Sequence, residues 1–200
     1  MPLRPTDVFV ASYQRSGTTW TQEIVWMLAN DLDYDRGAAI PLTQRCSFLE
    51  VFMYFDDEAE HSYAETAILK KDDVDINKLL KTMQLWATPA SQFLARRFLA
   101  GAPSPRFVKT HLPMTLLPPK ILDTAKVVYV ARDPRDVAVS CYHHARLLTM
   151  TGYIGTFKEF WNLFHQSMFT LTPYFEHVKE AWDKRDDPNM LLLFYEELSK

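Results

Sequence analysis

The chain has 200 residues, of which 48% are hydrophobic and 24% charged, a balance typical of one soluble globular domain with a sizeable core. The net charge of −3 gives no bulk reason to expect nucleic-acid binding, so an anion site would have to be built locally. There is no signal-like apolar segment at the start, no run long enough to span a bilayer, and there are only two cysteines; we therefore expect a cytoplasmic protein without a membrane partner.

The first predicted elements are a strand and a helix. Residues 7–12 form an apolar run that predicts a buried strand. Residues 19–30 follow as a helix with one apolar face, formed by Trp20, Ile24, Met27 and Leu28.

The turn between them, Tyr13-Gln-Arg-Ser-Gly-Thr-Thr-Trp20, has the layout that holds a phosphate. Backbone N–H groups in the first turn of a helix have no intrahelical partner, and the helix dipole adds partial positive charge there. The side chains add hydroxyl donors and a full charge, from Arg15, Ser16, Thr18 and Thr19. Gly17 is one of only five glycines. The alternative is an ordinary turn in which Thr18 or Thr19 caps the helix.

The middle of the chain carries weaker signals. Residues 31–47 are polar and predicted to be irregular, whereas 48–55 are mostly apolar and fit either a strand or a buried helical turn. The apolar spacing between Ile76 and Trp86 predicts an amphipathic helix.

The second half alternates strands and helices. Residues 106–110, 126–131 and 190–194 read as strands, the last one buried. Pro134 suits the first position of a helix, and Thr156 with Glu159 matches a capping box. A further helix after Pro173 is expected to bury Phe175, Val178 and Trp182.

Apolar strands that alternate with amphipathic helices predict a parallel sheet covered by helices on both faces, within a single domain. In such sheets ligands bind at the carboxyl ends of the strands. Four predicted strands end in polar residues, and we expect these ends to converge: 13–19, 109–111, 132–135 and 195–197.

Several side chains at these ends could carry chemistry. His111 can serve as a general base, and Lys109 points to the same side of its strand. Arg132 suits bidentate phosphate binding, although a salt bridge with Asp133 or Asp136 is the alternative. The remaining histidines form no metal-like set, so no metal is expected; His61, His165 and His177 are predicted on the surface or on a helix face.

Four segments together resemble the cytosolic sulfotransferase family, in the family's order. They are Tyr13-Gln-Arg-Ser-Gly-Thr-Thr-Trp20, Phe107-Val-Lys-Thr-His-Leu-Pro113, Val127-Val-Tyr-Val-Ala-Arg-Asp-Pro-Arg-Asp-Val-Ala-Val-Ser140 and Leu193-Phe-Tyr-Glu-Glu-Leu198. The first turn lacks the lysine of a Walker A motif. The resemblance implies sulfuryl transfer from 3′-phosphoadenosine 5′-phosphosulfate (PAPS) to a hydroxyl or amine, with no metal and no nucleic-acid partner, and leaves a homodimer open.

The resemblance also implies roles for individual residues. The 5′-phosphosulfate would be held by Arg15, Ser16, Gly17, Thr18 and Thr19, with Trp20 near the adenine. Arg132 and Ser140 would bind the 3′-phosphate, and Tyr195 would help seat the adenosine. His111 would be the base, with Lys109 beside it, and Arg15 would neutralise charge on the leaving phosphate.

The chain departs from the family pattern in two places. Gln14 and Arg15 stand where the family has proline and lysine. The family's C-terminal clamp on the 3′-phosphate and its N-terminal pocket segment have no counterpart in these 200 residues, so we expect a partial or shortened sulfotransferase domain.

The acceptor is expected to be a small apolar alcohol or phenol, because Phe48 and Phe52 could line an aromatic pocket. Two other functions remain open from the sequence. One is a protein that binds a nucleotide or ligand without turnover, and the other is a P-loop kinase for a small molecule.

Overall fold

A computed structural model describes residues 2–50, 101–148, 151–171 and 173–198. The chain separates into two compact units. One unit comprises Pro2–Leu49, Pro103–His143 and Gly155–Lys200, and it contains the sheet and every candidate site residue that the structure describes. The other comprises Met1, Glu50–Ala102 and His144–Ile154. The predicted single domain stays a prediction.

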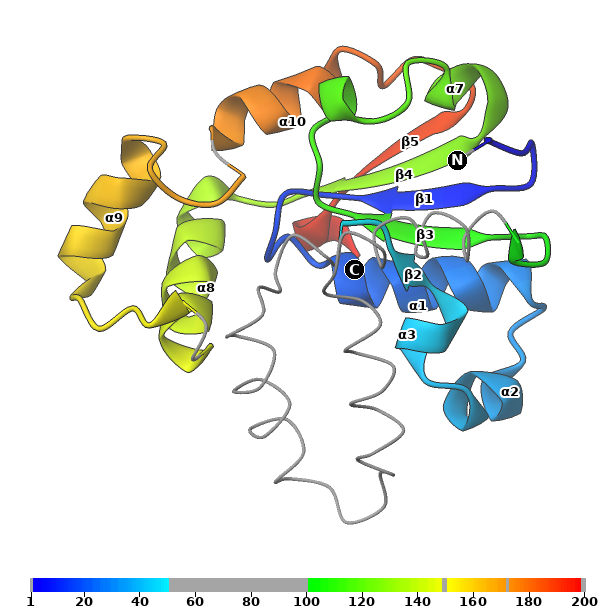
Figure 1. Ribbon diagram of the computed structural model, residues 1–200, viewed down its shortest axis with the longest axis horizontal. Helices are drawn as coiled ribbons and strands as arrows, with labels where there is room; N and C mark the ends of the chain where they lie inside the picture. The colour runs from blue at the N-terminus through cyan, green and yellow to red at the C-terminus, as the bar shows by residue number, and fades with distance from the viewer. Residues whose placement is uncertain (1, 51–100, 149–150, 172, 199–200) are drawn as a thin grey trace. The chain divides into compact units, whose positions relative to one another are not determined.

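Within the described residues the sheet has five strands in the order β2-β3-β1-β4-β5, and every pairing is parallel (Figure 1). The central strand is β1 (Val8–Ala11), which lies between β3 (Phe107–Thr110) and β4 (Lys126–Ala131). The edges are β2 (Ser47–Phe48) and β5 (Met190–Phe194).

Helices cover both faces of this sheet, so the predicted fold class is confirmed. The helix α1 (Thr18–Ala29) lies against one face, and α7 (Ile121–Thr124) and α10 (Tyr174–Trp182) lie on the other (Figure 1). The remaining described elements are α2 (Tyr34–Ala39), α3 (Leu42–Arg45), η2 (Met114–Leu116), α8 (Pro134–Leu147), α9 (Phe157–His165) and η4 (Tyr195–Glu197).

Strands β1 and β4 are apolar along their length because helices cover both of their faces. In β1, Phe9, Val10 and Ala11 are fully buried, and in β4 every residue after Lys126 is buried. None of the helices in the described ranges has the length and apolar character that crossing a bilayer requires.

The irregular segment predicted for 31–47 is wrong, since α2 and α3 lie there. Both are too short for helical periodicity to show, and α2 is begun by the Asp33 side chain, which accepts a hydrogen bond from the backbone N–H of Arg36 at 2.9 Å. Of the apolar run 48–55, Phe48 ends β2; residues 51–55 and the helix expected between Ile76 and Trp86 lie outside the described residues.

Two predicted helix faces are wrong. Helix α1 leaves Leu28 66% exposed, and α10 leaves Phe175 69% exposed, because each helix turns a partly polar face inward. The buried residues are Thr18, Thr21, Gln22 and Trp26 in α1, and Tyr174, His177 and Ala181 in α10. The strand 190–194 is likewise less buried than expected, because β5 is an edge and only Met190 is buried.

A buried ion pair joins the amino ends of β1 and β3. The Arg106 guanidinium donates Nε to Asp7 Oδ1 at 2.7 Å and Nη2 to Asp7 Oδ2, and both side chains are essentially inaccessible. Because Arg106 Nη2 also reaches the carbonyl of Pro2, the pair anchors the segment that leads into the central strand.

We predict that Arg106→Met lowers the free energy of unfolding by about 3–5 kcal/mol, because it leaves the Asp7 carboxylate buried without a counter-charge. Urea denaturation followed by circular dichroism measures the change. The control is Lys179→Met, which removes an exposed pair with Asp183 and should cost no more than about 1 kcal/mol. Equal losses in the two variants would show that the buried pair contributes nothing special.

Candidate functional site

The turn between β1 and α1 has an unusual backbone. Arg15 has φ 66° and Gly17 has φ 97°, so two residues in three are in the left-handed region. Turns of this kind can direct successive backbone N–H groups into one anion-binding concavity. Gly17 itself is the N-cap of α1 and supplies no side-chain cap, which corrects the alternative that Thr18 or Thr19 fills this position.

The ring of Tyr195 closes over this turn from the end of β5. A Cβ built on Gly17 would lie 2.9 Å from Tyr195 Cε2 and closer still to Cδ2, so only glycine fits. Trp20 meets the same ring edge-on, with ring centroids 5.9 Å apart. The turn and the end of β5 therefore form one packed unit, as predicted from the polar strand ends.

Arg132 at the end of β4 completes this side of the site. Its guanidinium lies over the Tyr195 ring, 4.3 Å from the centroid, and its Nη1 donates to the Arg15 carbonyl at 3.2 Å. The Arg15 side chain in turn donates Nε to Ser140 Oγ at 3.0 Å, from α8. The alternative salt bridge of Arg132 is present but long, with 3.4 Å between Nη2 and Asp136 Oδ2.

Two buried side-chain atoms in the described residues have no hydrogen-bond partner, and both lie here. They are Ser16 Oγ and Arg132 Nε. Leaving a buried polar group unpaired costs roughly 1–3 kcal/mol, so such groups are commonly explained by a ligand. A hydroxyl and a guanidinium N–H beside a helix N-terminus are donors that suit phosphate or sulfate oxygens.

His111 lies on the other side of β1, just after β3. Its Nδ1 is 3.0 Å from the carbonyl oxygen of Ser12, which can only accept, so Nδ1 carries a proton; in the neutral form of the ring, the lone pair is then on Nε2. The Ser12 hydroxyl lies 3.5 Å from the same Nδ1 and 2.5 Å from the Thr18 hydroxyl. Ser12 therefore connects the candidate base to the phosphate turn.

Lys109 and Phe48 lie beside this histidine. The Lys109 ammonium is 4.3 Å from the centroid of the Phe48 ring, and the same ring meets the His111 imidazole edge-on at 5.5 Å. Lys109 and Phe48 thus place a cation and an aromatic ring next to the candidate base. Phe52, the other predicted pocket residue, lies outside the described residues.

The sequence did not predict the buried side chains that pack around Tyr13, at the start of the turn between β1 and α1. Tyr13 is fully buried, and its ring meets those of Phe164, Tyr174 and His177. The Tyr174 hydroxyl donates to the carbonyl of Arg132. His177 lies on a face of helix α10, which was one of the two predicted placements, but it is not on the surface: its side chain is buried, and its Nε2 lies 2.9 Å from the His111 carbonyl oxygen. Its position three residues after the buried Tyr174 is the sequence signal for this burial.

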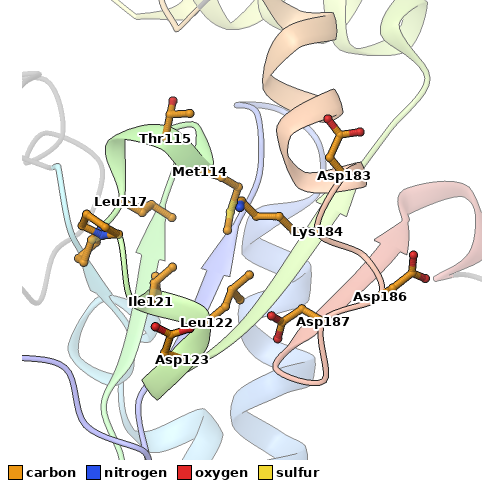
Figure 2. A pocket seen from close by; sticks show the side chains of 12 residues that line it. Met114, Thr115, Leu117, Ile121, Leu122, Asp123, Asp183, Lys184, Asp186 and Asp187 are labelled. Atoms are coloured by element: carbon orange, nitrogen blue, oxygen red, sulfur yellow. The ribbon is translucent and has the colours of Figure 1, made fainter.

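The cavity drawn in Figure 2 is a different place. It lies between η2, α7 and the end of α10, with the carboxylates of Asp123, Asp183 and Asp187 at its rim and Met114 and Ile121 inside. None of the candidate site residues lines it. Within the described ranges, no three His, Cys, Asp or Glu side chains are grouped so as to hold a metal ion.

Comparison with known proteins gives a consistent set of relatives. A family model described as a sulfotransferase domain matches residues 5–200. Luciferin sulfotransferase of Photinus pyralis is 34% identical over 203 residues, covering 99% of this chain and 48% of that protein. Sulfotransferase 1B1 of Mus musculus is 30% identical, covering 98% and 54%. The chain thus spans about half the length of the curated relatives it matches.

A solved structure agrees with these matches. The crystal structure of retinol dehydratase in complex with androsterone and the inactive cofactor PAP superposes with a TM-score of 0.82 and 53% identity, over 100% of this chain and 57% of that one.

We predict that Gly17→Ala destabilises the protein by about 1–3 kcal/mol, because alanine is strained at a φ of 97° and its methyl group meets the Tyr195 ring. Urea denaturation measures the loss. Gly37→Ala is the matched control, since Gly37 lies in α2 and a Cβ there meets only the flexible end of Met27 among side chains nearer than 3.4 Å. A control loss as large as that of Gly17→Ala would contradict the role assigned to the turn.

Proposed function

Because the chain belongs to the sulfotransferase family, we propose that the protein transfers a sulfuryl group from PAPS to a hydroxyl group of a small apolar acceptor. The observation that carries this proposal is the pair of unpartnered donors, Ser16 Oγ and Arg132 Nε, at two neighbouring strand ends. They offer two separate anion contacts to one ligand, and PAPS carries phosphate groups at two separate positions.

The donor would bind across the carboxyl ends of β1, β4 and β5. The turn, with Arg15, Ser16, Gly17, Thr18 and Thr19, would hold the 5′-phosphosulfate. Arg132 and Ser140 would hold the 3′-phosphate, while the rings of Trp20 and Tyr195 would contact the adenosine. The existing Arg15–Ser140 hydrogen bond and the Arg132 bond to the Arg15 carbonyl support this arrangement, because they bring the two proposed phosphate sites together.

The residues around His111 would act on the acceptor. Nε2 of His111 takes the hydroxyl proton as the oxygen attacks sulfur, and the Nδ1–H bond to Ser12 holds the ring in the tautomer that this requires. As the bond between sulfur and the phosphate oxygen breaks, the charge on the leaving phosphate is neutralised by Arg15, Lys109 and the N–H groups of the turn. Positioning and charge stabilisation thus supply most of the catalysis, as in phosphoryl transfer.

An apolar alcohol is the acceptor class that the site favours. The Phe48 ring contacts both Lys109 and His111, so the apolar body of an acceptor could pack on this ring while the acceptor hydroxyl reaches the imidazole. Two solved structures of retinol dehydratase, one in complex with androsterone and one with retinol, are 53% and 52% identical to this chain and support the same class.

The name retinol dehydratase indicates that an enzyme similar to this chain removes water from its substrate, and this suggests a second reaction for some acceptors. Transfer converts the hydroxyl into a sulfate ester, which is a good leaving group. An allylic alcohol could then lose sulfate and a proton to give an alkene, so the net reaction would be dehydration. Mass spectrometry of the products of an allylic and a phenolic acceptor separates the two reactions.

We predict that Arg132→Ala weakens binding of adenosine 3′,5′-bisphosphate by roughly 10- to 100-fold, the effect of losing charge-assisted hydrogen bonds of about 1.5–3 kcal/mol. Isothermal titration calorimetry on the full-length protein measures it. Arg135→Ala is the matched control, because that side chain is exposed and pairs with Asp133. Equal weakening in both variants, or stronger thermal stabilisation by Mg-ATP than by the bisphosphate, would overturn the proposed donor.

We predict that His111→Ala reduces transfer of labelled sulfate by about 10²–10⁴-fold, because the general base is removed, while bisphosphate binding changes little. A sulfate-transfer assay on the full-length protein, with calorimetry of the same preparation, separates the two effects. Phe48→Ala should instead raise the KM for an apolar acceptor. A wild-type protein that binds the bisphosphate but transfers no sulfate would favour the non-catalytic binding protein.

A further inference from the structure

A second histidine, His177, is hydrogen-bonded to the backbone of the proposed base and has no part in the proposed reaction. His177 in α10 is 1% exposed, and its Nε2 lies 2.9 Å from the backbone carbonyl oxygen of His111. Its Nδ1 lies 2.7 Å from the hydroxyl of Tyr129 in β4. A buried imidazole with a partner on each nitrogen is a fixed element of the structure.

The hydrogen bonds define the tautomer of His177. A backbone carbonyl can only accept, so Nε2 must carry a proton toward His111. Burial lowers the pKa of His177 below its ordinary value, which keeps the ring neutral near pH 7, so Nδ1 must accept from the Tyr129 hydroxyl. Burial also raises the pKa of Tyr129, so that hydroxyl keeps the proton it donates.

The hydrogen bond from His177 holds the backbone carbonyl of His111, whereas other contacts hold the His111 ring. The Ser12 carbonyl accepts from the ring Nδ1 at 3.0 Å, and Phe48 packs against the ring. The His111 peptide follows the last residue of β3, Thr110, and so lies beyond the strand itself. A donor at its carbonyl therefore restrains the backbone of His111, which the ring contacts with Ser12 and Phe48 do not hold directly.

We propose that His177 is a positioning residue for His111: it holds the peptide on which the base is mounted, so that the ring keeps its bond to Ser12 and directs Nε2 toward the acceptor. The inference rests on the proposed function, because it assumes that His111 is the base. His177 does not compete for the acceptor proton, since it is buried and both of its nitrogens are engaged.

The test compares two replacements of His177 in the full-length protein. His177→Phe keeps a ring that can still pack edge-on against Tyr13, which His177 contacts at 5.5 Å, but it removes the donor to His111. His177→Gln places an amide N–H near the position of Nε2 and can restore that donor. Met190→Ala is the control for lost stability alone. Met190 is buried at the start of β5, at the opposite end of that strand from Tyr195.

Two kinds of measurement are made on each variant. The first comprises kcat, the acceptor KM and the affinity for the bisphosphate. The other is the long-range ¹H–¹⁵N NMR signal of the His111 ring, assigned by its loss in His111→Ala. We expect His177→Phe to lower kcat roughly 10- to 100-fold, the scale of a misplaced catalytic group, with bisphosphate binding unchanged and the His111 tautomer disturbed. His177→Gln should recover most of the kcat and the wild-type signal.

The readouts also separate this inference from the proposed function. If the wild-type protein transfers no sulfate, the proposed function fails, yet a changed His111 signal in His177→Phe alone still supports positioning. An unchanged His111 signal in His177→Phe, equal losses in the Phe and Gln variants, or an equal kcat loss in Met190→Ala would overturn it. If His177→Phe does not fold, His177→Leu takes its place, because it also removes the donor to the His111 carbonyl; an undisturbed His111 signal there would likewise overturn the inference.

Discussion

The contact between the Tyr195 ring and the bare Cα of Gly17 is the constraint on which the candidate site depends. It lets the end of β5 lie directly on the turn after β1, although a whole strand, β4, separates the two in the sheet. Arg132, at the end of that intervening strand, then fits over the Tyr195 ring and reaches the Arg15 carbonyl. A Cβ at position 17 would collide with the Tyr195 ring, so the ring on which Arg132 lies would have to move.

Ser12 has the corresponding role on the other side of the central strand. Its carbonyl fixes the His111 tautomer, and its hydroxyl bonds the Thr18 hydroxyl in the first turn of α1. Ser12 is the first residue after β1, and from there it contacts His111 at the end of β3 and Thr18 at the start of α1. The distance between a proposed anion site and a proposed base is therefore set by the sheet and by one serine.

The sequence predicted β4 and β5 to the residue, because uninterrupted apolar runs bounded by turns indicate buried strands, and it predicted that the polar strand ends would converge. It mispredicted the inward faces of α1 and α10, where the apolar spacing indicated Leu28 and Phe175, both of which are exposed. Near the site these helices bury hydroxyl, amide and imidazole groups, whose partners come from distant strands. Periodicity carries no information about such partners, and so His177 was missed.

The polar inward faces of α1 and α10 also affect the stability of the fold. An apolar inward face would stabilise the fold more simply than buried polar groups, which contribute only when each finds a partner. In this site most of them do, through Thr18, Thr21 and His177. Ser16 Oγ and Arg132 Nε do not, and each unpaired atom costs the folded protein free energy. An anion that pairs both donors removes that cost when it binds, so part of its binding free energy is already stored in the folded chain.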